Sequence, residues 1–251
     1  MEQNLIDAGT QGFNLPHDVV TLPTGGVFYK SKKKSVKVGY LTANDENYLI
    51  GAGRSSENII LKLLRNKVYE HDLRPEELLD GDVEAILIFL RNTSFGSEYS
   101  VNLTDPATNK PFVGKINLDE LNIKKTQVKP DEDGTFTTKL PRTGATVKLR
   151  PTTFYDTIEL DKMADQYPVG LQAPRITWKL QKHIVEVDGE SDKAVIATFV
   201  ESLPIMDSKY IRNFLRENEP SLDLKRSVIA PSGELVSFEI AFGVDFFRPF
   251  F

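Results

Sequence analysis

The stretch of this sequence that comes nearest to a catalytic motif is the glycine-rich run Gly51–Ser56, GAGRSS. A phosphate-binding loop of that kind ends in Lys followed by Ser or Thr, and it lies between a strand and a helix. This run has no lysine and no strand-like segment before it. The pattern therefore favours a structural loop that leads into a helix near Asn58, and phosphate binding is the less favoured alternative.

Metal and nucleophile chemistry is equally poorly represented. The chain has no cysteine, which excludes disulfides, thiolate nucleophiles and cysteine-based zinc sites. Its three histidines, His17, His71 and His183, are scattered without the spacing of metal ligands. The acidic run Asp131–Asp133 lacks the spaced carboxylates and the distal Glu of a calcium loop. The sequence predicts no catalytic residue, no cofactor and no metal site, and hence a protein that is not an enzyme.

Composition and charge limit the partners. The 251 residues are 40% hydrophobic and 27% charged, with a formal net charge of −5, so binding to nucleic acid is not expected. The basic run Lys30–Lys37 could bind phosphate in isolation, but a solvated hairpin or edge strand is the favoured interpretation. No segment has the long apolar run of a membrane helix, and residues 1–10 do not resemble a signal peptide. We expect a protein that folds in a cytoplasm and does not insert into a membrane.

Hydrophobic periodicity and turn residues predict an α+β fold of antiparallel hairpins alternating with short helical sections. We expect a flexible arm at residues 1–14, an N-terminal strand and helical section at 15–97, a hairpin section at 98–150, and a C-terminal α+β section at 151–251. Asp82 and Thr153 are candidate helix N-caps, and Pro23–Gly26 has the chemistry of a turn with positive φ. The expected helices are 58–68, 75–79, 82–95, 153–164 and 207–218, and the expected strands are 36–40, 99–103, 112–118, 136–140, 145–149, 182–187, 235–240 and 242–247.

The C-terminal segment is the most informative candidate for binding. Four of the last six residues are Phe, in the run Phe246, Phe247, Arg248, Pro249, Phe250 and Phe251. Burying each ring would contribute about 2–3 kcal/mol, so the rings are expected to be covered. The cover could be the chain's own core or a partner protein, and both can hold for different rings. Because Pro249 interrupts a strand, we expect the outermost pair, Phe250 and Phe251, to contact another protein.

Several segments in order resemble the baseplate hub family of T4-type contractile phage tails. The resemblance runs from about Leu22 through most of the chain. Its motifs are LPTGGVFY at Leu22–Tyr29, LDGDVEAILIFLR at Leu79–Arg91 followed by Ser94–Gly96 and Tyr99, FVGKINLDEL at Phe112–Leu121, LPIMD at Leu203–Asp207, and VIAPSG at Val228–Gly233 followed by the Phe-rich end.

The chain departs from that family in its two predicted knuckles. Relatives often carry paired cysteines there that resemble zinc ribbons, whereas this chain has Asn102–Lys110 and Ala230–Gly233 without cysteine. If the knuckles persist, turn chemistry and packing must hold them.

The resemblance implies a structural or assembly component of the baseplate hub. Such a protein would be made in the host cytoplasm and could become part of the tail baseplate of the virion. Its partners would be other baseplate or tail proteins, with copies of itself in a symmetric ring as one possibility. Two alternatives stay open: an assembly chaperone absent from the finished virion, and, less favoured, a small-molecule enzyme that uses the Gly51–Ser56 loop.

Overall fold

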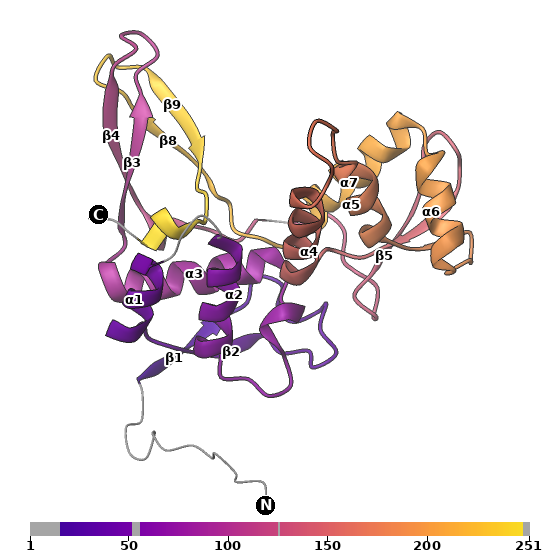
Figure 1. The fold of residues 1–251 in the computed structure, drawn as a ribbon, viewed down its shortest axis with the longest axis horizontal. Helices are drawn as coiled ribbons and strands as arrows, with labels where there is room; N and C mark the ends of the chain where they lie inside the picture. The colour runs from indigo at the N-terminus through magenta and orange to yellow at the C-terminus, as the bar shows by residue number, and fades with distance from the viewer. Residues whose placement is uncertain (1–15, 52–55, 125, 248–251) are drawn as a thin grey trace, which may run out of the picture.

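The computed structural model describes residues 16–51, 56–124 and 126–247, and it divides them into two bodies and an arm (Figure 1). The predicted fold class is confirmed: the elements are helices and small antiparallel sheets of two or three strands. In the described part of the chain, no helix is long and apolar enough to cross a membrane. The predicted arm at residues 1–14 lies outside the described residues.

The first body begins with strand β1 (His17–Thr21), which pairs antiparallel with β2 (Ser35–Gly39). Helices α1 (Ala43–Gly51) and α2 (Ser56–Lys67) follow, then a short 3-10 helix at Pro75–Glu77 and the central helix α3 (Asp80–Phe95). Two acids in the first turn of α3 suit the helix dipole. Its apolar side chains recur at helical spacing and form much of the core of this body; the fully buried ones are Val83, Ile86, Leu87 and Leu90.

The arm consists of two antiparallel hairpins from distant parts of the sequence. The first pairs β3 (Glu98–Thr104) with β4 (Pro111–Asn117), and the second pairs β8 (Lys225–Ile229) with β9 (Leu235–Glu239). Both hairpins project together from the first body (Figure 1). A 3-10 helix at Leu118–Glu120 ends the first hairpin, and another at Val244–Phe247 follows the second.

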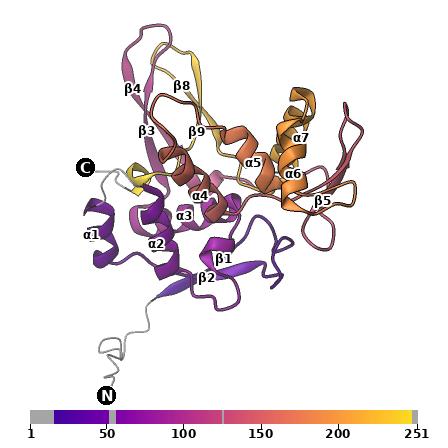
Figure 2. The same cartoon turned by 45° about the vertical axis from the view of Figure 1, so that its right-hand side comes forward.

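The second body has its own hydrophobic core around a three-stranded sheet. The strand order is β5 (Phe136–Lys139), β6 (Thr146–Leu149) and β7 (Ile184–Val187). Helices α5 (Arg175–His183), α6 (Lys193–Glu201) and α7 (Ile205–Asn218) complete it (Figure 2). Helix α4 (Phe154–Asp165) lies between the bodies: it packs beside α5, while its Phe154 and Ile158 belong to the core of the first body. The predicted cap of α4 is confirmed, because the Thr153 hydroxyl accepts a hydrogen bond from the Asp156 N–H at 3.2 Å.

Two local predictions were wrong. Asp82 is not an N-cap: α3 begins at Asp80, and Asp82 lies inside its first turn with a fully buried side chain. Residues 242–247 do not form a strand, because Val244–Phe247 is a 3-10 helix. Helices α1, α5 and α6 were not predicted, and α2 begins at Ser56, with residues 52–55 of the preceding loop outside the described part.

Candidate assembly surface

The two hairpins of the arm pack face to face, as the alternation of their side chains requires. In the first hairpin the alternate residues Tyr99, Val101 and Leu103 are half-buried, and in the second Val228 and Val236 are half-buried. Gly114 of β4 lies directly against Val228 of β8, and a Cβ at this glycine would lie 3.0 Å from a methyl group of Val228. The glycine therefore permits the close approach of the two hairpins.

The tips of the two hairpins are joined through a buried carboxylate. Asp105, at the tip of the first hairpin, is 1% exposed. It accepts hydrogen bonds from the Ser232 hydroxyl at 2.7 Å and the Ser232 N–H at 3.1 Å, across the interface, and from the Ala107 N–H at 3.0 Å. Burial alone would raise the pKa of Asp105, but these hydrogen bonds outweigh it and hold the pKa below its ordinary value. The carboxylate is therefore charged at neutral pH.

The knuckles without cysteine are also held by their own turns. In the first, Asn109 has a φ of 53°, and its N–H donates to the Asp105 carbonyl at 2.8 Å. In the second, Gly233 has a φ of 90°, and its N–H donates to the Ala230 carbonyl at 2.9 Å. These bonds and the Asp105–Ser232 contact supply the turn chemistry that the sequence demands. Among the residues that the structure describes, no three His, Asp or Glu side chains gather to hold a metal ion.

The outer face of the second hairpin carries an exposed apolar pair. Ile229 and Leu235 are directly opposite one another on β8 and β9 and are 72% and 67% exposed. They lie next to the tip that Asp105 fixes. Each hairpin is also a two-stranded sheet, so the strands present outer edges with backbone groups available for pairing. The tip of the arm thus combines exposed apolar side chains, open strand edges and a fixed backbone.

The base of the arm is fixed by a buried arginine. Arg91, at 2% exposed, donates hydrogen bonds to the carbonyl oxygens of Gly96 at 2.7 Å, Phe246 at 3.2 Å and Glu98 at 3.3 Å. Its guanidinium carbon lies 4.9 Å from the ring centroid of Tyr99, a position that favours a cation–π contact. One side chain therefore connects α3, the start of β3 and the C-terminal 3-10 helix.

The predicted partner-binding segment starts at this base. Phe246 and Phe247 are 1% and 2% exposed and belong to the core of the first body. Phe246 also packs against Tyr99, with ring centroids 5.3 Å apart. Arg248, Pro249, Phe250 and Phe251 lie outside the described residues. A role of the segment in binding a partner stays a prediction.

The turn at Pro23–Gly26 is held by Asp82, the residue that the sequence predicts as a helix N-cap. Asp82 accepts hydrogen bonds from the Thr24 N–H at 3.0 Å, from the Thr24 hydroxyl at 2.6 Å and from the Tyr29 hydroxyl. The Tyr29 hydroxyl in turn accepts a bond from the Leu79 N–H at 3.0 Å. Burial raises the pKa of Asp82 above its ordinary value. Two of the resemblance motifs, Leu22–Tyr29 and Leu79–Arg91, are therefore in contact, and their polar residues serve the fold.

Lys33 of the basic run and His183 both have partners within the fold. In the basic run, Lys33 pairs with Glu70 and with Asp72, the latter at 2.8 Å. His183 is buried at the end of α5, where its Nδ1 lies 3.0 Å from the Arg150 carbonyl oxygen. Burial lowers the pKa of His183 to about 4, so its ring is neutral at pH 7. His17, His71 and His183 lie in separate parts of the chain and form no joint site.

Comparison with known proteins identifies the family of the chain. The family model described as T4 bacteriophage base plate protein matches residues 26–247. This range includes the second body, both hairpins of the arm and all of the first body after β1. No curated protein and no solved structure matches the chain. The chain belongs to the T4 base plate protein family.

Proposed function

With membership of the T4 base plate protein family as the premise, we propose that this protein is a structural or assembly component of the baseplate hub. In this proposal the arm is its docking element. The observation that carries the proposal is the Ile229–Leu235 pair, exposed on a hairpin whose tip is held by the Asp105–Ser232 bonds. A monomer gains nothing from presenting such a pair to water, whereas a partner surface would cover it.

Docking through the arm has an expected energy and an expected geometry. Covering two aliphatic side chains that are each about two-thirds exposed would contribute roughly 2–4 kcal/mol, which is about 30- to 700-fold in affinity. The free edge of a hairpin can additionally pair with a strand of the partner, which adds backbone hydrogen bonds and sets the register. The fixed tip lowers the entropy that docking costs, because the loop is already ordered. No reacting group is required, which agrees with a role that is not enzymatic.

The test uses the double variant Ile229→Ser/Leu235→Ser and a matched control, Val169→Ser/Leu171→Ser. The control removes two apolar side chains that are 105% and 65% exposed in the loop between α4 and α5. Phage lacking the wild-type gene product are complemented with each variant, and purified particles are analysed by mass spectrometry.

We expect the arm variant to remain folded, with an unchanged thermal unfolding midpoint, and to reduce baseplate assembly at least tenfold. The control should support assembly normally. If mass spectrometry detects the protein in purified particles, it is a virion subunit. If assembly requires the protein but the finished particles lack it, it is an assembly factor. Normal assembly with the arm variant would exclude the arm as the docking element.

The C-terminal segment is proposed as a second contact with the partner. Its described part ends in the core at the base of the arm, where Arg91 holds the Phe246 carbonyl. The two last residues, Phe250 and Phe251, are proposed to contact the partner. Their deletion should leave a soluble, folded protein that fails to join the hub. Unfolding or precipitation of the truncated protein would instead assign the two rings to its own core.

A further inference from the structure

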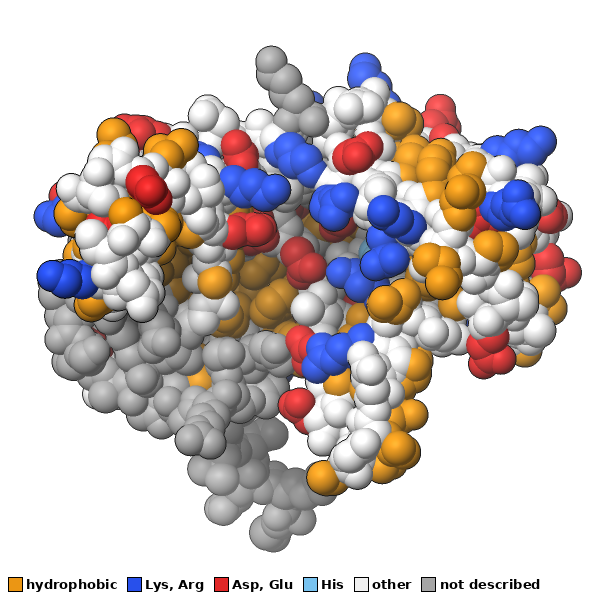
Figure 3. Space-filling model, turned by 90° about the horizontal axis from the view of Figure 1, so that it is seen from above, with side chains coloured by type: hydrophobic (Ala, Val, Ile, Leu, Met, Phe, Trp, Pro, Cys, Tyr) orange, Lys and Arg blue, Asp and Glu red, His pale blue; other side chains and the backbone are white. Residues whose placement is uncertain are grey.

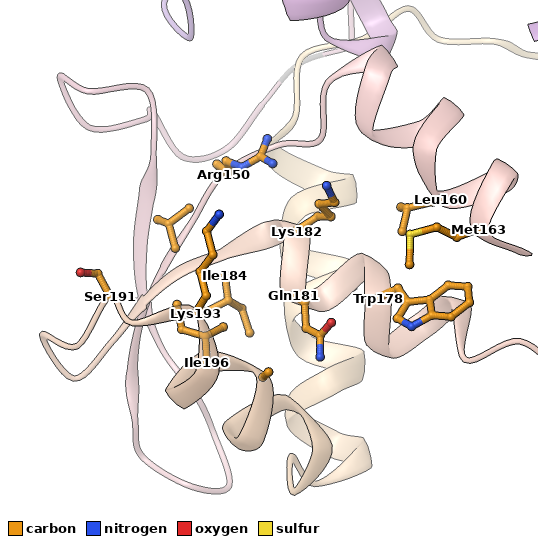
Figure 4. A pocket seen from close by; sticks show the side chains of 12 residues that line it. Arg150, Leu160, Met163, Trp178, Gln181, Lys182, Ile184, Ser191, Lys193 and Ile196 are labelled. Atoms are coloured by element: carbon orange, nitrogen blue, oxygen red, sulfur yellow. The ribbon is translucent and has the colours of Figure 1, made fainter. Parts of the chain in front are cut away.

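The second body contains a groove with a volume of about 510 Å³ between α4, α5 and α6 (Figure 4). The nitrogen atoms of Arg150, Lys182 and Lys193 point to one end of the groove, and Leu160, Met163 and Trp178 lie at the other. Seen from above, a hollow separates the arm from the second body (Figure 3). A partner could therefore reach the second body without displacing the arm.

Two of the three cations at the charged end of the groove already pair with acids that do not line it, and the third does not. Arg150 pairs with Asp156 at 2.7 Å, and Lys182 pairs with Glu159 at 2.5 Å. Lys193 forms no ion pair with any residue that the structure describes, and no Asp or Glu lines the groove.

The position of Lys193 is unfavourable within the chain alone. It is the first residue of α6, directly after the N-cap Asp192, and the helix dipole disfavours a cation there. The Asp192 carboxylate accepts bonds from the Ala194 and Val195 N–H groups at 2.8 and 3.1 Å. A carboxylate from outside would relieve this arrangement, since it would be attracted both by the ammonium group and by the helix N-terminus.

The other end of the groove is suited to a bulky apolar side chain. Trp178 is the single tryptophan of the chain, half-buried, and packs edge-on against Tyr167 with ring centroids 5.7 Å apart. Met163 is 38% exposed beside it. Tryptophan and methionine are enriched where proteins bind other proteins, because they offer large apolar contacts that adapt in shape. A site for a small inorganic anion would not need this apolar half, so the lining favours a peptide as the ligand.

We propose that the groove binds an acidic, apolar peptide segment of a second baseplate protein. A Glu or Asp of the segment lies at the Lys193 end, and a Leu or Phe lies against Trp178 and Met163. The occupant is taken as a baseplate protein because of the function proposed above, on which this inference rests. Groove and arm would then hold the protein at two separate points, which fixes its orientation in the assembly.

The test uses the full chain and the fluorescence of Trp178, which is the only tryptophan present. The probe is the blocked octapeptide SEELFSEL, compared with SQQLFSQL, which lacks the acids, and SEEAASEA, which lacks the bulky apolar groups. The variant is Lys193→Glu. The matched control is Lys209→Glu, which makes the same charge change at an exposed position of α7 that does not line the groove.

We expect SEELFSEL to change the Trp178 emission in a saturable manner and both comparison peptides to bind at least tenfold more weakly. Lys193→Glu should weaken binding at least tenfold, whereas Lys209→Glu should leave it within twofold of the wild type. Thermal unfolding of both variants checks that they are folded.

Three results would overturn the proposal. Equal losses for the two lysine variants would show a general charge effect, and inorganic phosphate binding as tightly as SEELFSEL would show a small-anion site. If the Trp178 emission changes with protein concentration and the protein sediments as a dimer, the groove binds a second copy of this chain. The arm variant Ile229→Ser/Leu235→Ser should bind the peptide normally. Failure of the groove is therefore distinguished from failure of the arm.

Discussion

Replacing Asp82 by Ala should destabilise the first body severely, because this carboxylate is the acceptor for three buried donors. They are the Thr24 N–H, the Thr24 hydroxyl and the Tyr29 hydroxyl. Asp82 is completely buried, and Thr24 and Tyr29 are 4% and 5% exposed, so water cannot readily replace the lost acceptor. Each buried donor without a partner costs about 1–3 kcal/mol.

The expected net loss is smaller than the sum of these three costs. Removing Asp82 also removes the unfavourable burial of a carboxylate, which is visible in its raised pKa. The two hydroxyls can also rotate towards other acceptors. We therefore expect a decrease of about 3–5 kcal/mol in the free energy of unfolding, a large part of the stability of a typical domain. Tyr29→Phe removes one donor and leaves the carboxylate, and should cost about 1–2 kcal/mol.

Urea denaturation of the two single variants and the double variant tests the reasoning. Because Tyr29 and Asp82 share one hydrogen bond, the double variant should lose at least about 1 kcal/mol less than the sum of the single losses. Unchanged slopes of the unfolding curves would confirm that the comparison is between similar states. A loss below about 1 kcal/mol for Asp82→Ala, or strictly additive losses, would refute the role assigned to this carboxylate.

Two further outcomes are expected. Gly25 and Gly26 have φ values of 58° and 77°, but a Cβ would collide with a neighbour only at Gly26, where it would lie 2.1 Å from the Lys33 carbonyl oxygen. Gly26→Val should therefore lower the thermal unfolding midpoint more than Gly25→Val. Equal midpoints for the wild type and both variants would contradict this expectation. Burial raises the pKa of both Glu84 and Glu219 to about 8 from an ordinary 4.5, and the Asp80 carboxylate adds to the shift. The stability that these two groups contribute is therefore full below pH 4.5, and it is lost as the pH rises towards 8. Relative to the wild type, Glu84→Gln should raise the free energy of unfolding by at least about 1 kcal/mol at pH 8 and by little at pH 4.5. A difference that does not depend on pH in urea titrations would contradict this expectation.

The sequence was a sound guide wherever the cause was local. Hairpins at 98–118 and 136–149 follow from alternation and turn residues, and the Thr153 cap follows from a side chain that bonds a backbone N–H three residues on. Helices α5 and α6 were missed because each has nine residues. Short apolar or mixed runs of this length fit a strand as well as a helix until packing decides.

The partner-binding surface was harder to find than the fold. The Phe-rich end attracted attention through its composition, but Phe246 and Phe247 are buried at the base of the arm. The exposed Ile229–Leu235 pair gave no comparable signal, because two aliphatic residues in a predicted hairpin are equally compatible with a core. The groove was also not predicted, since its lining comes from residues between 150 and 197, which belong to three helices and the strands beside them.

The sequence by itself determined the fold class, the absence of cysteine chemistry and the positions of the tight turns, because these depend on residue type and on neighbours a few positions away. Only the tertiary structure decided what the polar residues of those turns bind. Asp82 has the local pattern of a helix cap, yet its partner Thr24 lies 58 residues earlier. Asp105 looks like an ordinary turn residue, yet Ser232, 127 residues later, joins it to the second hairpin. A hydrogen bond between distant residues depends on how the whole chain closes, and spacing along the sequence does not contain that information.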